Sequence, residues 1–483
     1  MTAPRDAEPA PEAPPPQRPE ALSAATVTTR ERRLAIAALM CGTISTILSA
    51  TLINVALATF MTDMAVSHTV AQGLSTGFLA ANTIAMPVAP WMMGRLGFRK
   101  LYVLAISVFV AAALLGGFAP GAHAAIVARV IQGAAAGMIQ PLAMVVIFRM
   151  YPPDKRGSAM GLYGLGVVLA PALAPTLGGA LVEFAGWRSV FFVAIPVCLA
   201  GIVIALKALP DARPPGAGGR FDLLGFGLLA VAMSSLIAVL SMGMSQGWLS
   251  VQVLAAAVVA VAAGACFLAW ERRVARPLMD LKIYRAPGFG AAALCSMTLG
   301  LGLFGSTYLL PLLLETARGM SPAEVGLAMA PAGFAMALTF PLAGRLADRI
   351  ATRPQVMIGL GLFAAHALLL AWAEFAAGFW VIAAVMALGR MSLALVMPAL
   401  SAGGLRLLPE NQVAQGAAAL NVSRQFGGAV GVAILAVVLE SAEVALPGRP
   451  LDAFAITLAV MGGFGLTAMV VAVMLPGRRD GAA

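Results

Sequence analysis

The sequence predicts an all-α membrane protein with about fourteen membrane-spanning helices. Its 483 residues are 60% hydrophobic and 11% charged, whereas a soluble domain carries about 25% charged residues. Apolar runs recur from Leu34 to Leu475, and many exceed the roughly 18 residues that cross a hydrocarbon core of about 30 Å. Because backbone amides in lipid must find their hydrogen-bond partners within the protein, such runs form helices.

The apolar runs fall into three sets. The first set predicts six helices, at residues 34–57, 72–92, 101–119, 123–149, 158–182 and 187–207. Two more helices follow, at 221–243 and 250–270. The last set again predicts six, at 289–313, 322–343, 354–373, 377–400, 421–440 and 452–475. We therefore expect a tail (1–29), a six-helix bundle (30–207), a linker containing two additional helices (208–288), a second six-helix bundle (289–476) and a short tail (477–483).

Basic residues mark one side of the predicted membrane. Lys and Arg crowd the N-terminal segment and alternate loops, and only Arg188, Arg318 and Arg449 fall on the other side. Because cytoplasmic loops are enriched in Lys and Arg, both termini are predicted to be cytoplasmic. The net charge of +10 is thereby assigned to membrane topology rather than to a nucleic-acid partner. The first 29 residues lack an apolar core and are expected to be a disordered tail rather than a signal peptide.

Residues 80–100 and 333–353 share one layout. In both, an apolar helix with a proline is followed by Gly-Arg-Leu and further basic residues, with Gly94 and Gly344 at matching positions. Such similarity between two six-helix halves is typical of transporters that rock around a site at the membrane midplane. The basic segment 271–285 between the halves fits either a surface helix on lipid headgroups or an ordinary charged loop.

Few ionisable residues lie inside the predicted spans, where a charge is costly and therefore a candidate for function. Arg129 lies in the fourth span and shares one helix face with Gln132 and Gly133. Arg424 is a second candidate at membrane depth. His366 in the eleventh span is either a proton carrier or a packed core side chain.

The fifth span contains Pro171, Pro175, Gly178 and Gly179. Missing amide donors and missing side chains weaken a helix and favour bends. A bend here is either a gate or a tolerated kink. The pair Gly133 and Gly137 is expected to let two helix backbones approach closely.

The residues that metal sites and enzymes need do not cluster in this sequence. No group of His, Cys, Asp and Glu has metal-ligand spacing, and no paired acids stand at one membrane face. We expect no metal, no cofactor and no enzymatic activity. The four cysteines stand singly in apolar segments, so each is expected to be unpaired and buried: Cys41, Cys198, Cys266 and Cys295.

Several segments resemble the major facilitator superfamily. Residues 125–137 (AIVARVIQGAAAG) are similar to the fourth-helix motif of its exporters, with Arg129 at the motif's arginine, and 170–179 (APALAPTLGG) resembles its fifth-helix antiporter motif. The similarity extends to the fourteen-span drug:proton antiporter branch, the EmrB/QacA type. It is carried there by residues 49–57 (SATLINVAL), 276–285 (RPLMDLKIYR), 344–349 (GRLADR) and 424–433 (RQFGGAVGVA).

The resemblance implies a secondary active transporter that exports small lipophilic compounds by alternating access, coupled to protons, in the bacterial inner membrane. It implies proton coupling for Arg129 and a gate at Pro171 to Gly179, and it leaves a periplasmic adaptor protein as an open question. It also implies latches on the cytoplasmic side, for which the candidates are Arg95, Arg99, Arg345, Asp348 and Arg349. The simpler alternative is that the loop arginines set topology and that Asp348 balances their charge.

Two positions depart from the family pattern. Ser49 stands where the branch has a first-helix aspartate, and Gly94 stands at the acidic position of the first loop motif. Neither serine nor arginine titrates near neutral pH, so the proton carrier is unassigned. Without an acidic anchor, the site is expected to favour neutral or anionic substrates over cations. A narrow-specificity metabolite carrier and a non-transporting sensor or scaffold remain alternatives.

Overall fold

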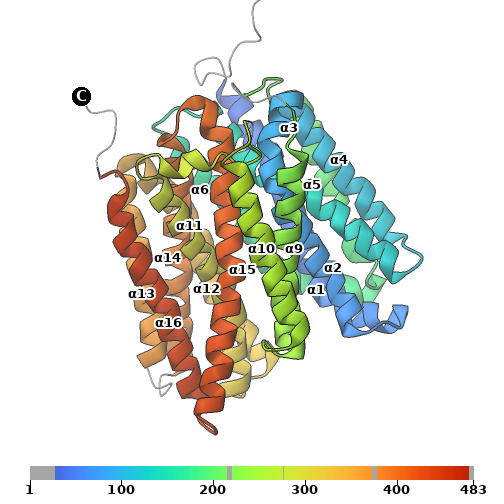
Figure 1. The fold of residues 1–483 in the computed structure, drawn as a ribbon, viewed down its shortest axis with the longest axis vertical. Coiled ribbons are helices and arrows are strands. Elements are labelled where there is room, and N and C mark those ends of the chain that lie inside the picture. The colour runs from blue at the N-terminus through green and yellow to red at the C-terminus, as the bar shows by residue number, and fades with distance from the viewer. Residues whose placement is uncertain (1–27, 215–219, 276, 373–377, 478–483) are drawn as a thin grey trace, which may run out of the picture.

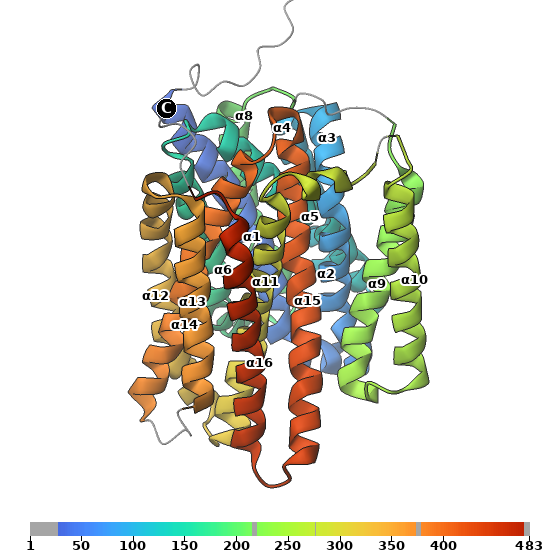
Figure 2. The same ribbon diagram turned by 60° about the vertical axis from the view of Figure 1, so that its left-hand side comes forward.

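Long helices run side by side along one common direction in the computed structural model (Figure 1). The structure describes residues 28–214, 220–275, 277–372 and 378–477. Within these ranges the regular segments are α-helices and short 3-10 or π turns, and no strand is present. Both ends of the described chain lie at the same end of the bundle, which we call the terminal face; the opposite end is the distal face (Figures 1 and 2).

The first half of the chain forms one group of helices: α1 (Thr29–Met64), α2 (His68–Ala85), α3 (Ala89–Leu96), α4 (Phe98–Gly117), α5 (Ala122–Met150), α6 (Arg156–Ala185), α7 (Ser189–Phe192) and α8 (Ile195–Ala208). The short turn η1 (Met86–Val88) joins α2 to α3. Thr28 and Glu31 form a capping box at the start of α1, which satisfies free amides of the first turn. Gly97, with φ of 83°, separates α3 from α4 because glycine adopts positive φ without strain.

A helical hairpin stands at the side of the bundle, beside α2 and α15 (Figure 2). It consists of α9 (Leu223–Gln246) and α10 (Val251–Glu271). Asp222 links α9 to α10. Its carboxylate accepts from Gly225 N at the start of α9 at 2.9 Å and from Trp270 Nε1 near the end of α10 at 3.0 Å. Cys266 on α10 is exposed, so its predicted burial was wrong: only 11% of the α10 span is buried inside the protein.

The segment after this hairpin leads through η2 (Leu281–Arg285) into the second half. Leu278 and Ile283 are buried, and Met279 N donates to Glu271 Oε2 at 3.1 Å. These apolar side chains therefore pack inside the protein rather than on lipid headgroups, which favours the ordinary-loop reading of this segment.

The second half forms a matching group of helices: α11 (Phe289–Leu312), η3 (Leu313–Ala317), α12 (Pro322–Arg349), α13 (Thr352–Trp372), α14 (Phe379–Arg406), η4 (Glu410–Gln412), α15 (Val413–Ala445), α16 (Pro450–Val471) and η5 (Ala472–Met474). In both halves the helices pair in the same way. The first helix packs on the fifth, as α1 on α6 and α11 on α15, and the second packs on the fourth, as α2 on α5 and α12 on α14. The packing thus repeats as the sequence does.

Twelve helices among the described residues are long and apolar enough to cross a membrane. The two other predicted spans, 72–92 and 158–182, coincide with α2 to α3 and with α6. The predicted all-α membrane fold is confirmed, while the count of fourteen spans and the unit boundaries stay predictions. Residues 1–27, 215–219 and 478–483, which hold most of both predicted tails and part of the linker, lie outside the described residues.

The two halves meet closely where α6 crosses α12 near the terminal face. A Cβ on Gly161 would lie 2.5 Å from the carbonyl oxygen of Phe340, and a Cβ on Gly344 would lie 2.6 Å from that of Gly157. Only glycine allows the backbones to approach this closely. This crossing holds the two halves together near the terminal face.

Candidate functional site

Arg129 is 1% exposed, two turns into α5. Its Nε donates to the carbonyl oxygen of Leu74 at 3.1 Å. Its Nη1 donates to Ser49 Oγ at 2.9 Å and to Gln132 Oε1 at 3.2 Å. The guanidinium also lies 4.3 Å from the centre of the Phe78 ring. One cation therefore ties together α1, α2 and α5.

No carboxylate accompanies Arg129 in the described part of the chain. Its Nη2 and the Nε2 of Gln132 are buried without a hydrogen-bond partner. An unpaired buried charge costs several kcal/mol, and the Phe78 ring offsets only about 2 kcal/mol of that cost. Ser49 thus occupies the position from which an acid would neutralise Arg129, a contact that the sequence did not predict.

Gly133, the third predicted member of this face, serves the packing of α5 on α2. A Cβ at Gly133 would lie 2.2 Å from the carbonyl oxygen of Phe78, and a Cβ at Gly137 would lie 2.1 Å from that of Asn82. Two consecutive glycine contacts hold the helix backbones together at the level of Arg129. Phe78, whose ring lies beside the Arg129 guanidinium, is one of the two residues at these contacts.

We expect Gly133→Ala to lower the thermal midpoint of the purified protein by several degrees, because the added methyl group meets backbone and overpacking costs about 1–3 kcal/mol. Gly463→Ala is the matched control, since nothing lies within 4 Å of a Cβ at that position of α16. Thermal unfolding in detergent measures both. Equal midpoints for the two variants would contradict the packing role.

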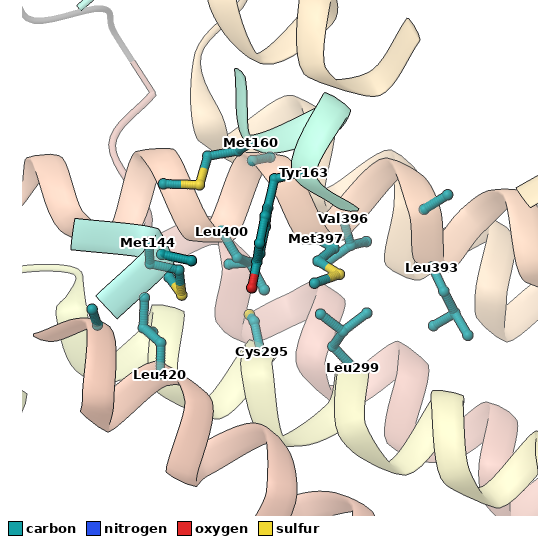
Figure 3. Close-up of a cluster of buried hydrophobic side chains, with 14 of the residues drawn as sticks. Met144, Met160, Tyr163, Cys295, Leu299, Leu393, Val396, Met397, Leu400 and Leu420 are labelled. Carbon is teal, nitrogen blue, oxygen red and sulfur yellow. The ribbon is translucent and has the colours of Figure 1, made fainter. Parts of the chain in front are cut away.

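A hollow lies between the halves, about one to three helical turns from the terminal face. Its polar lining consists of Gln140, Tyr163, Ser401, Asn421 and Arg424. Its apolar lining consists of Met144, Met160, Val167 and Met397. These residues come from α5 and α6 of the first half and from α14 and α15 of the second. Figure 3 shows Tyr163 between Met144 and Met397, its hydroxyl directed toward Cys295 and Leu299 of α11.

Arg424 carries the charge in this hollow. Its Nη2 donates to Gln140 Oε1 at 2.9 Å and to Asn421 Oδ1 at 2.5 Å. Gln140 belongs to the first half, so this bond joins α5 to α15 across the hollow. Next to it, Tyr163 shares a 2.9 Å hydrogen bond with Thr43 on α1. The predicted candidate Arg424 is therefore part of the lining, whereas Arg129 belongs to a separate cluster.

The predicted gate residues lie on α6, which is helical from Arg156 to Ala185. A Cβ on Gly178 would lie 2.9 Å from Leu52 Cδ2, so α6 packs closely on α1 there. Nothing lies within 4 Å of a Cβ on Gly179. The side chains of Pro171 and Pro175 lie outside the described residues, and the gate stays a prediction.

His366 is 1% exposed at the crossing of α13 with α14, away from the hollow. Its ring fills the space beside Gly389, where a Cβ would lie 2.1 Å from His366 Cδ2. It packs edge-to-face against Phe363 with ring centres 5.6 Å apart, and its Nδ1 has no hydrogen-bond partner among the described residues. This geometry fits a packed core side chain, and a role in proton transfer stays a prediction.

Among the predicted latch residues, Asp348 at the end of α12 reaches the other half. Its Oδ1 accepts from Gly157 N at 2.6 Å, and its Oδ2 accepts from Ser158 N at 2.8 Å and from the Ser158 hydroxyl. Both amides belong to the first turn of α6, where backbone N–H groups lack helical partners and the helix dipole favours a negative charge. Asp348 thus caps a helix of the opposite half.

The four arginines that were predicted as latches, unlike Asp348, make no described bond to the other half. Arg95 is exposed and lies 5.4 Å from the Trp91 ring. Arg345 and Arg349 are exposed, with no hydrogen bond or ion pair in the described structure. Arg99 is held within the first half, because its Nε donates to the carbonyl oxygen of Leu209 at 2.6 Å. None of these bonds joins the two halves.

Two contacts between the halves escaped the sequence analysis. Arg149, at the end of α5, lies 3.4 Å from the Glu410 carboxylate and donates to its carbonyl oxygen at 3.0 Å. Arg406, at the end of α14, donates to the carbonyl oxygen of Pro153 at 2.5 Å. Both arginines lie at the ends of long spans, on the side of the predicted membrane that is rich in basic residues. In the sequence alone, an arginine there indicates only membrane topology. The terminal face therefore carries several polar bonds from one half to the other.

Comparison with known proteins places this arrangement in a family. The model of the Major Facilitator Superfamily matches residues 39–432 and 292–482. The chain belongs to the Major Facilitator Superfamily. The prediction from the fourth- and fifth-helix motifs is confirmed, and this multi-span membrane protein has bacterial relatives that are transporters.

Relatives with curated names support the predicted branch of the superfamily. The chain is 30% identical to the multidrug export protein EmrB of Haemophilus influenzae over 402 residues, which are 82% of this chain and 78% of that protein. It is 30% identical to the methylenomycin A resistance protein of Streptomyces coelicolor over 439 residues, 90% and 91% of the two chains. Among solved structures, the proton:xylose symporter XylE has the same fold, with a TM-score of 0.66 at 14% identity, covering 92% of this chain and 95% of that one.

Proposed function

We propose that this chain is a secondary active exporter of small lipophilic compounds that works by alternating access. The observation that carries the proposal is the hollow between the halves, which is lined from both sides by methionines and a few polar groups. Flexible methionine side chains can repack around ligands of varied shape. The names of the EmrB and methylenomycin relatives support export of drugs or metabolites.

The terminal face is the cytoplasmic side in this proposal, because the basic residues gather there. The polar bonds of Asp348, Arg149 and Arg406 then close the cytoplasmic end of the path between the halves. Alternating access requires that these bonds break together when the hollow opens to the cytoplasm. The described arrangement therefore represents a state closed on the cytoplasmic side.

Protons are the expected coupling ion by family resemblance, although Ser49 removes the usual acid. Arg129 organises the region where that acid would stand. A transporter-derived sensor, or a carrier narrow in specificity, is the second candidate, and the missing acid is the observation that favours it. Transport measurements separate these possibilities.

We expect cells that lack their own drug pumps to accumulate less of a fluorescent lipophilic dye when they express this chain. A protonophore should abolish the difference. Arg129→Ala should abolish it too, because the variant leaves the Leu74 carbonyl and Gln132 without their donor inside α1, α2 and α5, whereas Arg129→Lys should retain part of the activity.

Arg449→Gln is the matched control, because Arg449 is exposed on the loop before α16 and, among the described residues, forms an ion pair with Asp452 alone. Accumulation that never changes across a broad panel of dyes, with verified membrane expression, would overturn drug export and favour the sensor or the narrow carrier.

A further inference from the structure

We infer that the hollow selects lipophilic anions and that Arg424 is the residue that binds their charged group. This inference rests on the proposed transport function and names its substrate class. It begins with the balance of charge around the hollow. Arg424 contributes a cation to the lining, and the lining contains no acidic residue.

The partners of Arg424 leave its charge uncompensated. Its two hydrogen bonds use one nitrogen, Nη2, and end on the neutral amides of Gln140 and Asn421. No ion pair reaches Arg424 within the described residues. A guanidinium presents five N–H donors in a planar fork that suits carboxylate, sulfonate or phosphate oxygens. The remaining donors of Arg424 can therefore receive an anionic ligand.

Charges farther from the hollow also disfavour a cationic ligand. Arg129 and Arg390 also lie within the long apolar helices α5 and α14, and Arg390 donates to the neutral Thr307 hydroxyl at 2.9 Å. The buried acids of the described chain are Asp348 and Glu271, both at helix ends on the terminal face. In a low-dielectric interior such unbalanced cations repel a cationic ligand strongly. The hollow therefore disfavours the lipophilic cations that an acidic site would attract.

The remaining lining fits the apolar part of the same ligand. Met144, Met160 and Met397 surround the ring of Tyr163 (Figure 3). Ser401 offers a hydroxyl with no hydrogen bond in the described structure, which can donate to an anion in the same hollow. The hollow thus combines charged and donor-rich groups with apolar, adaptable side chains. A lipophilic monoanion matches both kinds of lining.

An anionic cargo also gives the missing first-helix acid a physical explanation. In a membrane that is negative inside, the potential itself drives an anion outward, by about fifty-fold at equilibrium for one charge at 100 mV. Export then needs no side chain that carries a proton in the opposite direction. Ser49 at the place of an aspartate is compatible with such transport.

The test uses three probes that share a pyrenebutyl group: a permanent sulfonate anion, a neutral alcohol and a permanent trimethylammonium cation. Binding to the purified protein is measured by pyrene fluorescence in nanodiscs. We expect the sulfonate to bind at least about tenfold more tightly than the cation, because hydrogen bonds to charged groups contribute about 1.5–3 kcal/mol. Arg424→Gln should weaken sulfonate binding about tenfold and leave the alcohol nearly unchanged, whereas Arg424→Lys should rescue part of the loss. Arg449→Gln, an equal loss of charge at an exposed site, should change neither.

Transport in proteoliposomes completes the test. With a valinomycin-imposed potential and no pH gradient, the sulfonate should accumulate on the positive side, and Arg424→Gln should remove most of that flux. Preference for the cation, or sulfonate binding unaffected by Arg424→Gln, would overturn the inference and leave the exporter proposal intact if the cation or the alcohol is transported. Failure to transport any of the three probes, together with the negative dye panel described above, would instead overturn the proposed function.

Discussion

Asp348→Asn is expected to open the terminal face and to slow transport at least about tenfold. The carboxylate accepts two backbone amides and one hydroxyl from α6, and each hydrogen bond to a charged group contributes about 1.5–3 kcal/mol. An asparagine has one acceptor oxygen, and its amide group would point a donor at another donor. Losing about 1.4 kcal/mol already shifts a two-state equilibrium tenfold, so the state closed at this face should lose its dominance.

Spin labels in a cysteine-less background can follow this opening. Lys100 at the start of α4 and Arg349 at the end of α12 are both exposed and belong to opposite halves. Asp348→Asn should lengthen the distance between labels at these positions. The distance in Asp348→Glu should lie between those of the wild type and of Asp348→Asn. Arg345→Gln is the matched control on the same turn of α12, because Arg345 is exposed and unbonded in the described structure. An unchanged distance distribution in Asp348→Asn would remove Asp348 from the closure.

The closure is asymmetric, because the two repeats differ at their acidic position. The second repeat has Asp348 two residues after its Gly-Arg-Leu, whereas the first repeat has Phe98 at the same distance and Gly94 where the family motif is acidic. A pseudosymmetric transporter could carry one helix-capping acid in each half. Here the capping contact described comes from the second half alone, and Arg149 and Arg406 supply the other polar bonds at this face. A single substitution at Asp348 should therefore have a large effect.

The sequence predicted the helices well because membrane insertion depends on local composition. Each predicted apolar run coincides with one helix or with consecutive shorter helices in the described structure, since a helix needs about 20 apolar residues to span lipid. Arg129, Gln132 and Gly133 were expected on one face, and the bond from Arg129 to Gln132 agrees with that periodicity. The fold could be predicted to this extent from composition and spacing.

Contacts between distant segments could not be predicted in this way. Nothing local in Asp348 indicates that its partners are Gly157 and Ser158, because the pairing depends on how α12 crosses α6. Motif comparison showed that Ser49 replaces an acid but not that its hydroxyl touches Arg129. At His366 the residue type suggests proton transfer, while the position beside Gly389 fits packing, and proton transfer stays a prediction.

Part of the symmetry between the two halves is visible in the structure but not in the sequence. Arg99 donates to the carbonyl oxygen of Leu209, and Arg353 donates to that of Leu475. Each arginine lies at the start of the third helix of its half, and each carbonyl ends the sixth helix of the same half. The two contacts anchor equivalent helices, yet Gly-Phe-Arg and Ala-Thr-Arg share little beyond the arginine. Only the geometry shows that these residues are equivalent.

Ser49→Asp is expected to raise the thermal midpoint of the protein, although it adds a charge inside the membrane. The Ser49 hydroxyl already lies 2.9 Å from Arg129 Nη1, so an aspartate at this position can accept from the same guanidinium. Arg129 has already lost its hydration in the native fold, and only the new carboxylate has to be desolvated. At an effective dielectric constant near 20, two unit charges about 3 Å apart attract by about 5 kcal/mol. The ion pair should therefore outweigh the cost of adding the acid.

A double-mutant cycle isolates this pair from other effects of the substitutions. Ser49→Asp, Arg129→Leu and the double variant should show a coupling of about 3 kcal/mol, because the aspartate is compensated only while the arginine is present. Ser49→Asn, similar in shape to aspartate but uncharged, is the matched control and should not stabilise the protein. If Ser49→Asp lowers the thermal midpoint by the same amount in the wild type and in Arg129→Leu, the two side chains do not interact. If coupling is found, the same variant measures whether a carboxylate at position 49 makes transport depend on the pH gradient, because the pair then supplies the titratable group that serine lacks.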